Sequence, residues 1–149
     1  MSRDEHRVGA LSVLLVEDDP GDVLIAREAL RAGQLGSRVD VVSDGVEAMA
    51  YLRREGNYAE AVRPDLILLD LNLPRKSGHE VLAEVKSDQS LRRIPVVVLS
   101  TSVAATDVNR CYDLHANAYV AKPVDFGAFA SVVQQIDAFF SSVAELPAR

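Results

Sequence analysis

Short apolar runs alternate with longer amphipathic stretches along most of this chain. Five runs are rich in aliphatic residues, and apolar residues in the segments between them recur every three or four positions. Such runs are typical of strands in a buried sheet, and the intervening segments are typical of helices. The runs lie at 11–16, 39–42, 66–69, 96–99 and 118–121.

Capping and terminating residues mark the helices between these strands. Asp19 followed by Pro20 predicts a capped helix through residue 32, which Gly33 and Gly36 end. Asp125 predicts the cap of a last helix that reaches about residue 142. The other expected helices lie at 46–54, 78–87 and 104–115, and the segment 56–63 is expected to be a polar connector.

Strict alternation of strands and helices predicts parallel crossovers. The sequence therefore predicts an α/β fold, a flavodoxin-like doubly wound five-stranded parallel sheet in the order 2-1-3-4-5 with five helices. We expect one domain at 11–142, after a flexible N-terminal lead-in at 1–10 and before a C-terminal tail at 143–149.

Composition narrows the function classes. The chain has 149 residues, of which 48% are hydrophobic and 26% charged, as in soluble globular proteins. A net charge of -6 argues against direct nucleic-acid binding, and no apolar run approaches the ~20 residues that span a membrane. The one cysteine, Cys111, allows no internal disulfide and suits a reducing compartment, so we expect a cytoplasmic protein.

Polar side chains follow the ends of four predicted strands. In a parallel sheet of the order above, these positions share one edge. Carboxylates about 4 Å apart repel by about 4 kcal/mol at an effective dielectric near 20, so several acids will not gather without a cation. Hard oxygen ligands suit Mg²⁺. The residues concerned are Glu17, Asp18, Asp19, Asp70, Asn72, Ser100 and Lys122.

This set also predicts phosphoryl chemistry. Asp70, at the end of the central strand, can act as a carboxylate nucleophile and form an acyl phosphate. Lys122 and a metal ion would neutralise charge on the transferred group, and Ser100 offers a hydroxyl.

Four sequence pieces resemble the receiver domain of two-component response regulators. They are Leu-Leu-Val-Glu-Asp-Asp at 14–19, Leu-Leu-Asp-Leu-Asn-Leu-Pro at 68–74, Val-Leu-Ser-Thr-Ser at 98–102 and Tyr-Val-Ala-Lys-Pro at 119–123. All four occur in order, each after a predicted strand. The resemblance covers roughly residues 11–142.

The resemblance implies a role for each matching residue. Asp70 would be the phosphoacceptor, Asp18 would bind Mg²⁺ directly and Glu17 through water. The metal set would be completed by Asp70 and the backbone carbonyl of Asn72.

The remaining matched positions would serve the phosphoryl group and the conformational switch. Ser100 and Lys122 would contact the phosphoryl group, with a cis bond between Lys122 and Pro123. Tyr119 would be the switch aromatic, turning inward as Ser100 moves toward the phosphate.

The segment Leu-Pro-Arg-Lys-Ser-Gly at 73–78 and the long connector resemble single-domain regulators of phytochrome-type kinases. The implied function is a Mg²⁺-dependent regulator phosphorylated by a sensor histidine kinase, a bacteriophytochrome. It would dephosphorylate itself and act on no external substrate. Arg75 and Lys76 depart from the family pattern, where an apolar residue is frequent. Output would come from conformational change or a homodimer through the fourth helix, fifth strand and fifth helix.

Several alternatives stay open. A phosphorylation-independent pseudo-receiver would bind partners only. A haloacid dehalogenase-type phosphatase would need an Asp where Asn72 stands, and a flavin-binding flavodoxin would need a first loop that does not repel phosphate. Asp18 could be only a helix cap, Thr101 competes with Ser100, and Tyr119 could be an ordinary edge aromatic. The apolar stripe from Phe126 to Phe140 could be simple core or part of the dimer surface.

Overall fold

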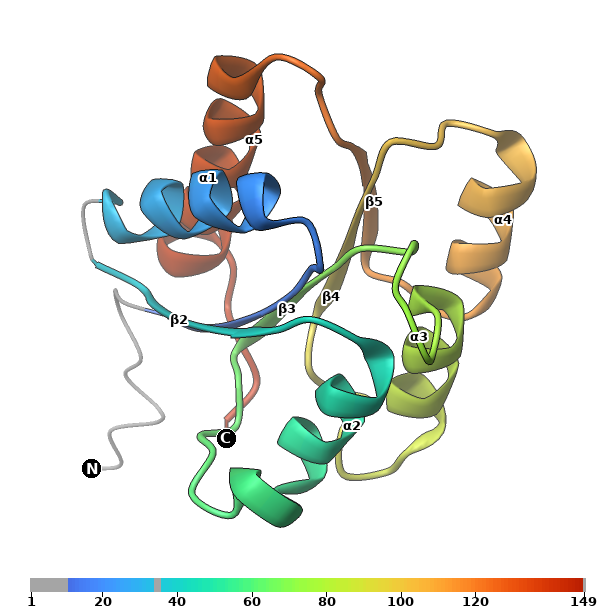
Figure 1. Cartoon of the computed structure of the whole chain (residues 1–149). Helices are drawn as coiled ribbons and strands as arrows, with labels where there is room; N and C mark the ends of the chain where they lie inside the picture. The colour runs from blue at the N-terminus through green and yellow to red at the C-terminus, as the bar shows by residue number, and fades with distance from the viewer. Residues whose placement is uncertain (1–10, 34–35, 149) are drawn as a thin grey trace.

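The computed structural model describes residues 11–33 and 36–148. The expected lead-in at 1–10 lies outside these residues. Figure 1 shows three layers: α1 and α5 cover one face of a central sheet, and α2, α3 and α4 cover the other. Within the described part of the chain no helix is long and apolar enough to cross a bilayer.

Five parallel strands form the sheet in the order β2-β1-β3-β4-β5, which confirms the predicted fold. Val16 pairs with both Val42 and Leu69, and Leu69 pairs with Val98, so the carboxyl ends of neighbouring strands meet. The strands are β1 (Ser12–Val16), β2 (Arg38–Val42), β3 (Leu66–Leu69), β4 (Val96–Ser100) and β5 (Ala118–Ala121).

The capping residues act as the sequence predicts. Asp19 accepts a hydrogen bond from the backbone N–H of Asp22, and Asp125 accepts one from that of Ala128, both at 2.8 Å. The helices are α1 (Pro20–Arg31), α2 (Gly45–Arg53), α3 (Gly78–Ser87), α4 (Ala105–Asp113) and α5 (Phe126–Ala138).

Two hydrophobic clusters lie on opposite faces of the sheet. One joins alternate sheet residues such as Leu14 and Ile67 to α2, α3 and α4. The other joins residues such as Leu15 and Leu68 to α1 and α5. Because successive strand side chains point to opposite faces, an unbroken apolar strand supplies both clusters. The strand ends are therefore fixed from both sides.

Four details differ from the expectation. The polar connector contains a short 3₁₀ helix, η2 (Gly56–Tyr58), and α5 ends at Ala138 and continues as a π-helical turn, η3 (Phe139–Val143). In the expected tail, Leu146 packs against the cluster beneath α1 and α5. Phe126 is not core, since it is 74% exposed.

Candidate functional site

Backbone hydrogen bonds extend the sheet one residue beyond three strands and fix the chemical residues there. The N–H of Glu17 donates to Val42 and that of Asp70 to Val16, each at 3.0 Å. The N–H of Lys122 donates to the carbonyl of Ser100 at 2.8 Å. These residues therefore leave the sheet at defined positions along one edge.

Their side chains converge as the sequence predicts. The Nζ of Lys122 lies 2.7 Å from Oε1 of Glu17 and 3.5 Å from Oδ2 of Asp70. Ligand oxygens of Glu17, Asp18 and Asp70 all lie within 4.8 Å of one another. Glu17, Asp70 and Lys122 are buried and Asp18 is exposed. The site is thus open on the Asp18 side.

Burial sets the protonation of Glu17. It raises the pKa of this carboxyl to about 7, because the hydrogen bond from Lys122 offsets only part of the desolvation and Asp70 raises the pKa further. Its Oε2 accepts hydrogen bonds from the N–H groups of Asp18 and Asp19, at 3.1 and 3.2 Å. A cation at this edge would relieve the crowding of acids that favours the protonated form.

Lys122 remains charged in this setting. Burial alone would lower its pKa, but the hydrogen bonds to Glu17 and Asp22 outweigh burial and raise it. Its Nζ also lies 5.9 Å from the ring centre of Phe129, beneath the site. Lys122 therefore provides a fixed positive charge beside Asp70.

The acid cluster fits a divalent cation. Three carboxylates from two adjacent strand ends supply hard oxygen donors, and one lysine does not balance their charge. Such donors with an open side suit Mg²⁺ or Mn²⁺, which keep water or substrate ligands. Glu17, Asp18 and Asp70 would hold the ion.

Asn72 begins the loop that follows Asp70. Its N–H donates to Oδ1 of Asp70 at 3.3 Å, and its side chain is exposed. At the end of the loop, Gly78 packs against the backbone of Asp70 so closely that an added Cβ would lie 2.3 Å from the Asp70 carbonyl oxygen. The loop is thereby folded back onto Asp70.

Charged residues hold the same loop to two helices. Arg75 lies 3.2 Å from Asp44, the N-cap of α2, and Lys76 pairs with Glu84 of α3. Gly45 makes room for the carbonyl of Lys76, since a Cβ there would lie 2.1 Å from that oxygen. The departure at Arg75 and Lys76 therefore replaces apolar packing with ion pairs.

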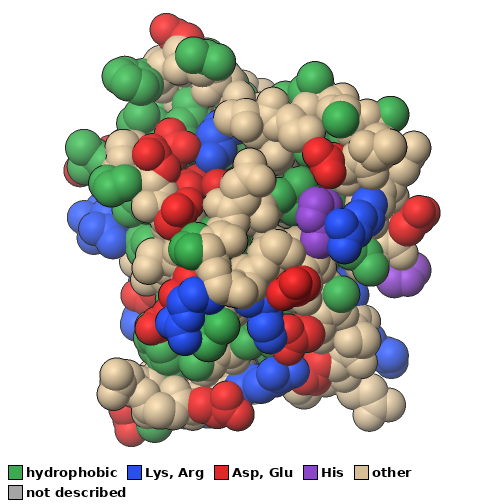
Figure 2. Space-filling view, turned by 45° about the vertical axis from the view of Figure 1, so that its right-hand side comes forward, with side chains coloured by type: hydrophobic (Ala, Val, Ile, Leu, Met, Phe, Trp, Pro, Cys, Tyr) green, Lys and Arg blue, Asp and Glu red, His purple; other side chains and the backbone are tan. Residues whose placement is uncertain are grey.

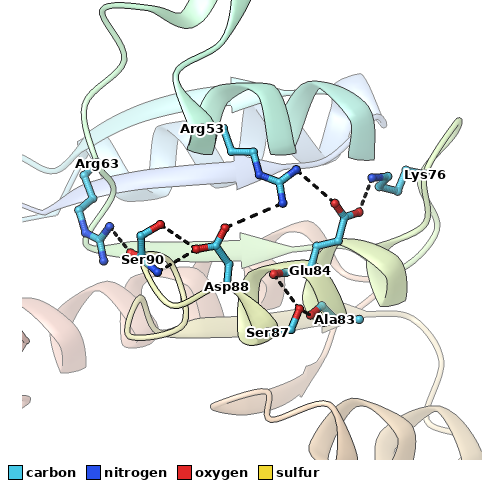
Figure 3. Close-up of polar contacts among 8 residues, drawn as sticks. All are labelled: Arg53, Arg63, Lys76, Ala83, Glu84, Ser87, Asp88 and Ser90. Atoms are coloured by element: carbon cyan, nitrogen blue, oxygen red, sulfur yellow. Dashed lines mark hydrogen bonds and ion pairs between the residues drawn. The ribbon is translucent and has the colours of Figure 1, made fainter.

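Figure 3 shows how these pairs continue across α2 and α3. Arg53 bridges Glu84 at 3.4 Å and Asp88 at 3.9 Å, and Asp88 in turn accepts a hydrogen bond from the Ser90 hydroxyl. Acidic and basic side chains are interspersed across the lower half of the surface in Figure 2. The network links the loop after β3 to the outer faces of both helices.

The two switch candidates meet at a neighbouring residue. Ser100 is fully buried at the end of β4, and its hydroxyl oxygen accepts a hydrogen bond from the N–H of Ser102 at 3.1 Å. The hydroxyl of Tyr119 donates to the Ser102 carbonyl at 2.8 Å. Thr101 is exposed. The hydroxyl that lies in the interior is therefore that of Ser100, and not that of Thr101.

The prediction of a cis peptide bond between Lys122 and Pro123 is wrong for this structure. Every peptide bond in residues 11–33 and 36–148 is trans, including that between Lys122 and Pro123. The trans isomer is the intrinsically favoured one for a bond to proline, by about 0.5–1 kcal/mol. Lys122 reaches Glu17 and Asp22 with the bond in this form.

Sequence reasoning missed three polar residues around the site. Asp22, interpreted only as a favourable first-turn acid, lies 3.0 Å from Nζ of Lys122. Its place on the third residue of α1 was a signal, because the first turn of that helix starts beside the acid cluster. Ser102 and Asp107 carried no comparable signal, since their contacts depend on the course of one loop.

Comparisons with known proteins agree with this geometry. The chain matches the family model of the response regulator receiver domain over residues 13–134. Response regulator Rcp1 of Synechocystis sp. is 44% identical over 136 residues, which cover 91% of this chain and 92% of that protein.

Two solved structures have the same fold over most of the chain. The phosphorylated cyanobacterial phytochrome response regulator RcpA has a TM-score of 0.91 and 51% identity, with 94% of this chain and 100% of that chain covered. The Mn²⁺-bound form of Rcp1 has a TM-score of 0.88 and 43% identity, with coverage of 93% and 99%.

Proposed function

The chain belongs to the response regulator receiver family, and from that premise we propose that Asp70 accepts a phosphoryl group from a partner histidine kinase in a Mg²⁺-dependent reaction. The observation that carries the proposal is the position of Asp70. Its carboxylate lies at the end of the central strand, between the charged Lys122 and the acids Glu17 and Asp18. The conformational change that follows phosphorylation is the signal.

The proposed step is a simple displacement. A carboxylate oxygen of Asp70 attacks phosphorus, and an O–P bond forms as the P–N bond to the kinase imidazole breaks. The imidazole leaves with the electron pair and takes up a proton. Lys122 is already poised to pair with a phosphoryl oxygen, because its Nζ lies 3.5 Å from Oδ2 of Asp70.

The metal and the hydroxyl complete the proposed site. Glu17, Asp18, Asp70 and the carbonyl of Asn72 would hold Mg²⁺, which supplies electrostatic stabilisation of the phosphoryl oxygens. The hydroxyl of Ser100 would donate a hydrogen bond to the phosphoryl group. We assign slow hydrolysis of the acyl phosphate to the same residues: water attacks phosphorus, the bond to the Asp70 oxygen breaks, and inorganic phosphate and the free carboxylate result. The protein would act on no external substrate.

The partner proposal rests on the relatives. RcpA is described as a cyanobacterial phytochrome response regulator, and the bacteriophytochrome response regulator RtBRR has 43% identity and a TM-score of 0.73 over 93% of this chain. We therefore propose a phytochrome-type sensor kinase as the phosphoryl donor, acting in the cytoplasm.

We also propose a homodimer through α4, β5 and α5. β5 is an edge strand of the sheet, and apolar side chains near it are exposed: Val103 is 73% exposed and Tyr112 is 49% exposed. Exposed apolar groups beside a sheet edge favour association.

The primary test is intact mass after incubation with acetyl phosphate. We expect wild type to gain one phosphoryl group with Mg²⁺ and none after chelation of the metal. Asp70→Asn should gain none in either condition. If folded wild type gained no phosphoryl group with any divalent metal, the protein would instead be a phosphorylation-independent interaction module.

A further inference from the structure

Ser102 connects three parts of the site region with its own polar groups. Its N–H donates to the hydroxyl oxygen of Ser100 at 3.1 Å, and its carbonyl accepts from the hydroxyl of Tyr119 at 2.8 Å. Its hydroxyl donates to Oδ2 of Asp107 at 2.6 Å. The two expected switch residues are therefore joined through one loop residue, which is also bound to α4.

The start of α4 depends on that residue. Ala104 occupies the N-cap position and offers no side-chain cap. Ser102 substitutes for one, because its hydroxyl oxygen accepts the N–H of Ala104 at 3.3 Å while it donates to Asp107 in the first turn. Cys111 is the one fully buried side chain of this nine-residue helix. A shift of Ser102 would therefore release the N-terminal turn of α4.

The second oxygen of Asp107 faces a histidine. Nε2 of His79, on the first turn of α3, lies 3.9 Å from Oδ1 of Asp107, which is too far for a hydrogen bond. That nitrogen is buried and has no hydrogen-bond partner among the described residues. An unsatisfied buried polar group costs about 1–3 kcal/mol, so a small movement that joins His79 to Asp107 is favourable.

The charges around His79 come from α4. Burial lowers the pKa of His79, the charge of Arg110 lowers it further, and that of Asp107 opposes them. These two residues are the charged groups that bear on the imidazole. A closer approach of Asp107 would shift that balance toward the protonated imidazole.

We propose that Asp107 is a two-position acceptor that binds Ser102 while Asp70 is unmodified and binds His79 once Asp70 is phosphorylated. The proposal rests on the proposed function at Asp70. When the Ser100 hydroxyl turns to the phosphoryl group, the N–H of Ser102 loses its acceptor and the loop loosens. Ser102 then releases Asp107, and the His79 contact draws α4 against α3. Ser102 and Asp107 are positioning residues.

The test is an NMR pH titration of the His79 imidazole in the full chain, with Mg²⁺, in the presence and absence of beryllofluoride, a phosphoryl mimic. His79→Gln identifies the signal. We expect beryllofluoride to raise the pKa of His79 by roughly one unit, because a carboxylate then accepts its hydrogen bond. Asp107→Asn should abolish the rise.

Ser102→Ala provides an independent variant. It should raise the pKa of His79 even without beryllofluoride, since it frees Asp107. Ser90→Ala is the matched control, because Ser90 also donates its hydroxyl to an aspartate, Asp88, at 2.7 Å, but on the α3 side away from the loop. It should leave the His79 titration unchanged.

Two results would overturn the proposal. One is an unchanged His79 titration while ¹⁹F NMR shows beryllofluoride bound to the wild type. The other is a Ser102→Ala variant whose His79 titrates like that of the wild type. If neither beryllofluoride binding nor a phosphoryl adduct on Asp70 occurred, the proposed function itself would fail, and the Asp107 proposal with it.

Discussion

At the residue scale, the site is a balance between clustered acids and one lysine. Asp18 has a carboxylate oxygen within 4.8 Å of carboxylate oxygens of Glu17 and Asp70, and it forms no ion pair with any of the described residues. Repulsion at such distances is about 1 kcal/mol in water and more in a less polar setting. Asp18 is exposed, so the lower figure applies.

Removal of this charge should therefore stabilise the metal-free fold. We expect Asp18→Asn to raise the free energy of unfolding in urea by about 1 kcal/mol with chelator present. Mg²⁺ at 100 times its dissociation constant should raise the free energy of unfolding of the wild type by about 2.7 kcal/mol, and that of the variant by far less. Asp19→Asn is the control. It removes one negative charge close to the same site, and it keeps the helix cap because Asn caps a helix as well as Asp does. Equal effects of the two variants would contradict a specific role for Asp18.

The sequence predicted that Asp70, Glu17 and Lys122 would lie together, but it did not predict the further contacts of this group. Asp70, Glu17 and Lys122 follow apolar strands directly, and parallel pairing alone brings strand ends together. Asp22 and Ser102 could not be placed in the same way. Their contacts depend on the rotation of α1 and on the path of a loop, and neither follows from hydrophobic spacing.

At the element scale, ion pairs add to the apolar cluster that α2, α3 and the loop after β3 share. Glu84 binds Lys76 of the loop and Arg53 of α2, and Arg53 also reaches Asp88 (Figure 3). The side chains of Arg53 and Glu84 are 39% and 31% exposed. Exposed pairs contribute about 0.2–1 kcal/mol each, and salt screens them.

Glu84→Gln should therefore destabilise the protein in a salt-dependent manner. We expect a loss of about 0.5–1 kcal/mol in urea unfolding at low ionic strength, and almost none at 1 M NaCl, where the screening length falls to about 3 Å. Glu60→Gln, an exposed acid for which no ion pair is found in the described chain, is the matched control. A loss that persists at high salt would indicate packing by the Glu84 stem instead.

Elements with strong local signals were predicted more accurately than those that depend on tertiary contacts. Asp19 and Asp125 mark α1 and α5 through caps that require only a few neighbouring residues. The tail is different, because Leu146 is held by a cluster built from distant parts of the chain. The exposure of Phe126 likewise follows from where α5 starts relative to the sheet, which spacing within the helix does not determine.

At the scale of the whole molecule, the two outer surfaces differ in what they expose. On the α1 side, Leu24 is 60% exposed. On the α4 and β5 side, Val103 and Tyr112 are exposed, and the backbone N–H of Tyr119 on the edge strand donates to the hydroxyl oxygen of Tyr112 at 3.2 Å. A specific dimer needs about 800 Å² buried per partner, which exceeds what a few side chains supply. The proposed interface must therefore include the β5 edge.

The dimer proposal predicts a surface-specific effect in sedimentation velocity. We expect the weight-average sedimentation coefficient of wild type to rise with protein concentration, and Tyr112→Lys to weaken self-association at least tenfold by placing an unpaired charge in the interface. Leu24→Lys makes the same kind of change on the α1 side and should associate like wild type. A concentration-independent monomer would exclude the dimer. Loss of association in Leu24→Lys but not in Tyr112→Lys would instead indicate that the interface lies on the surface of α1, because only the surface that is buried between copies is sensitive to a new charge.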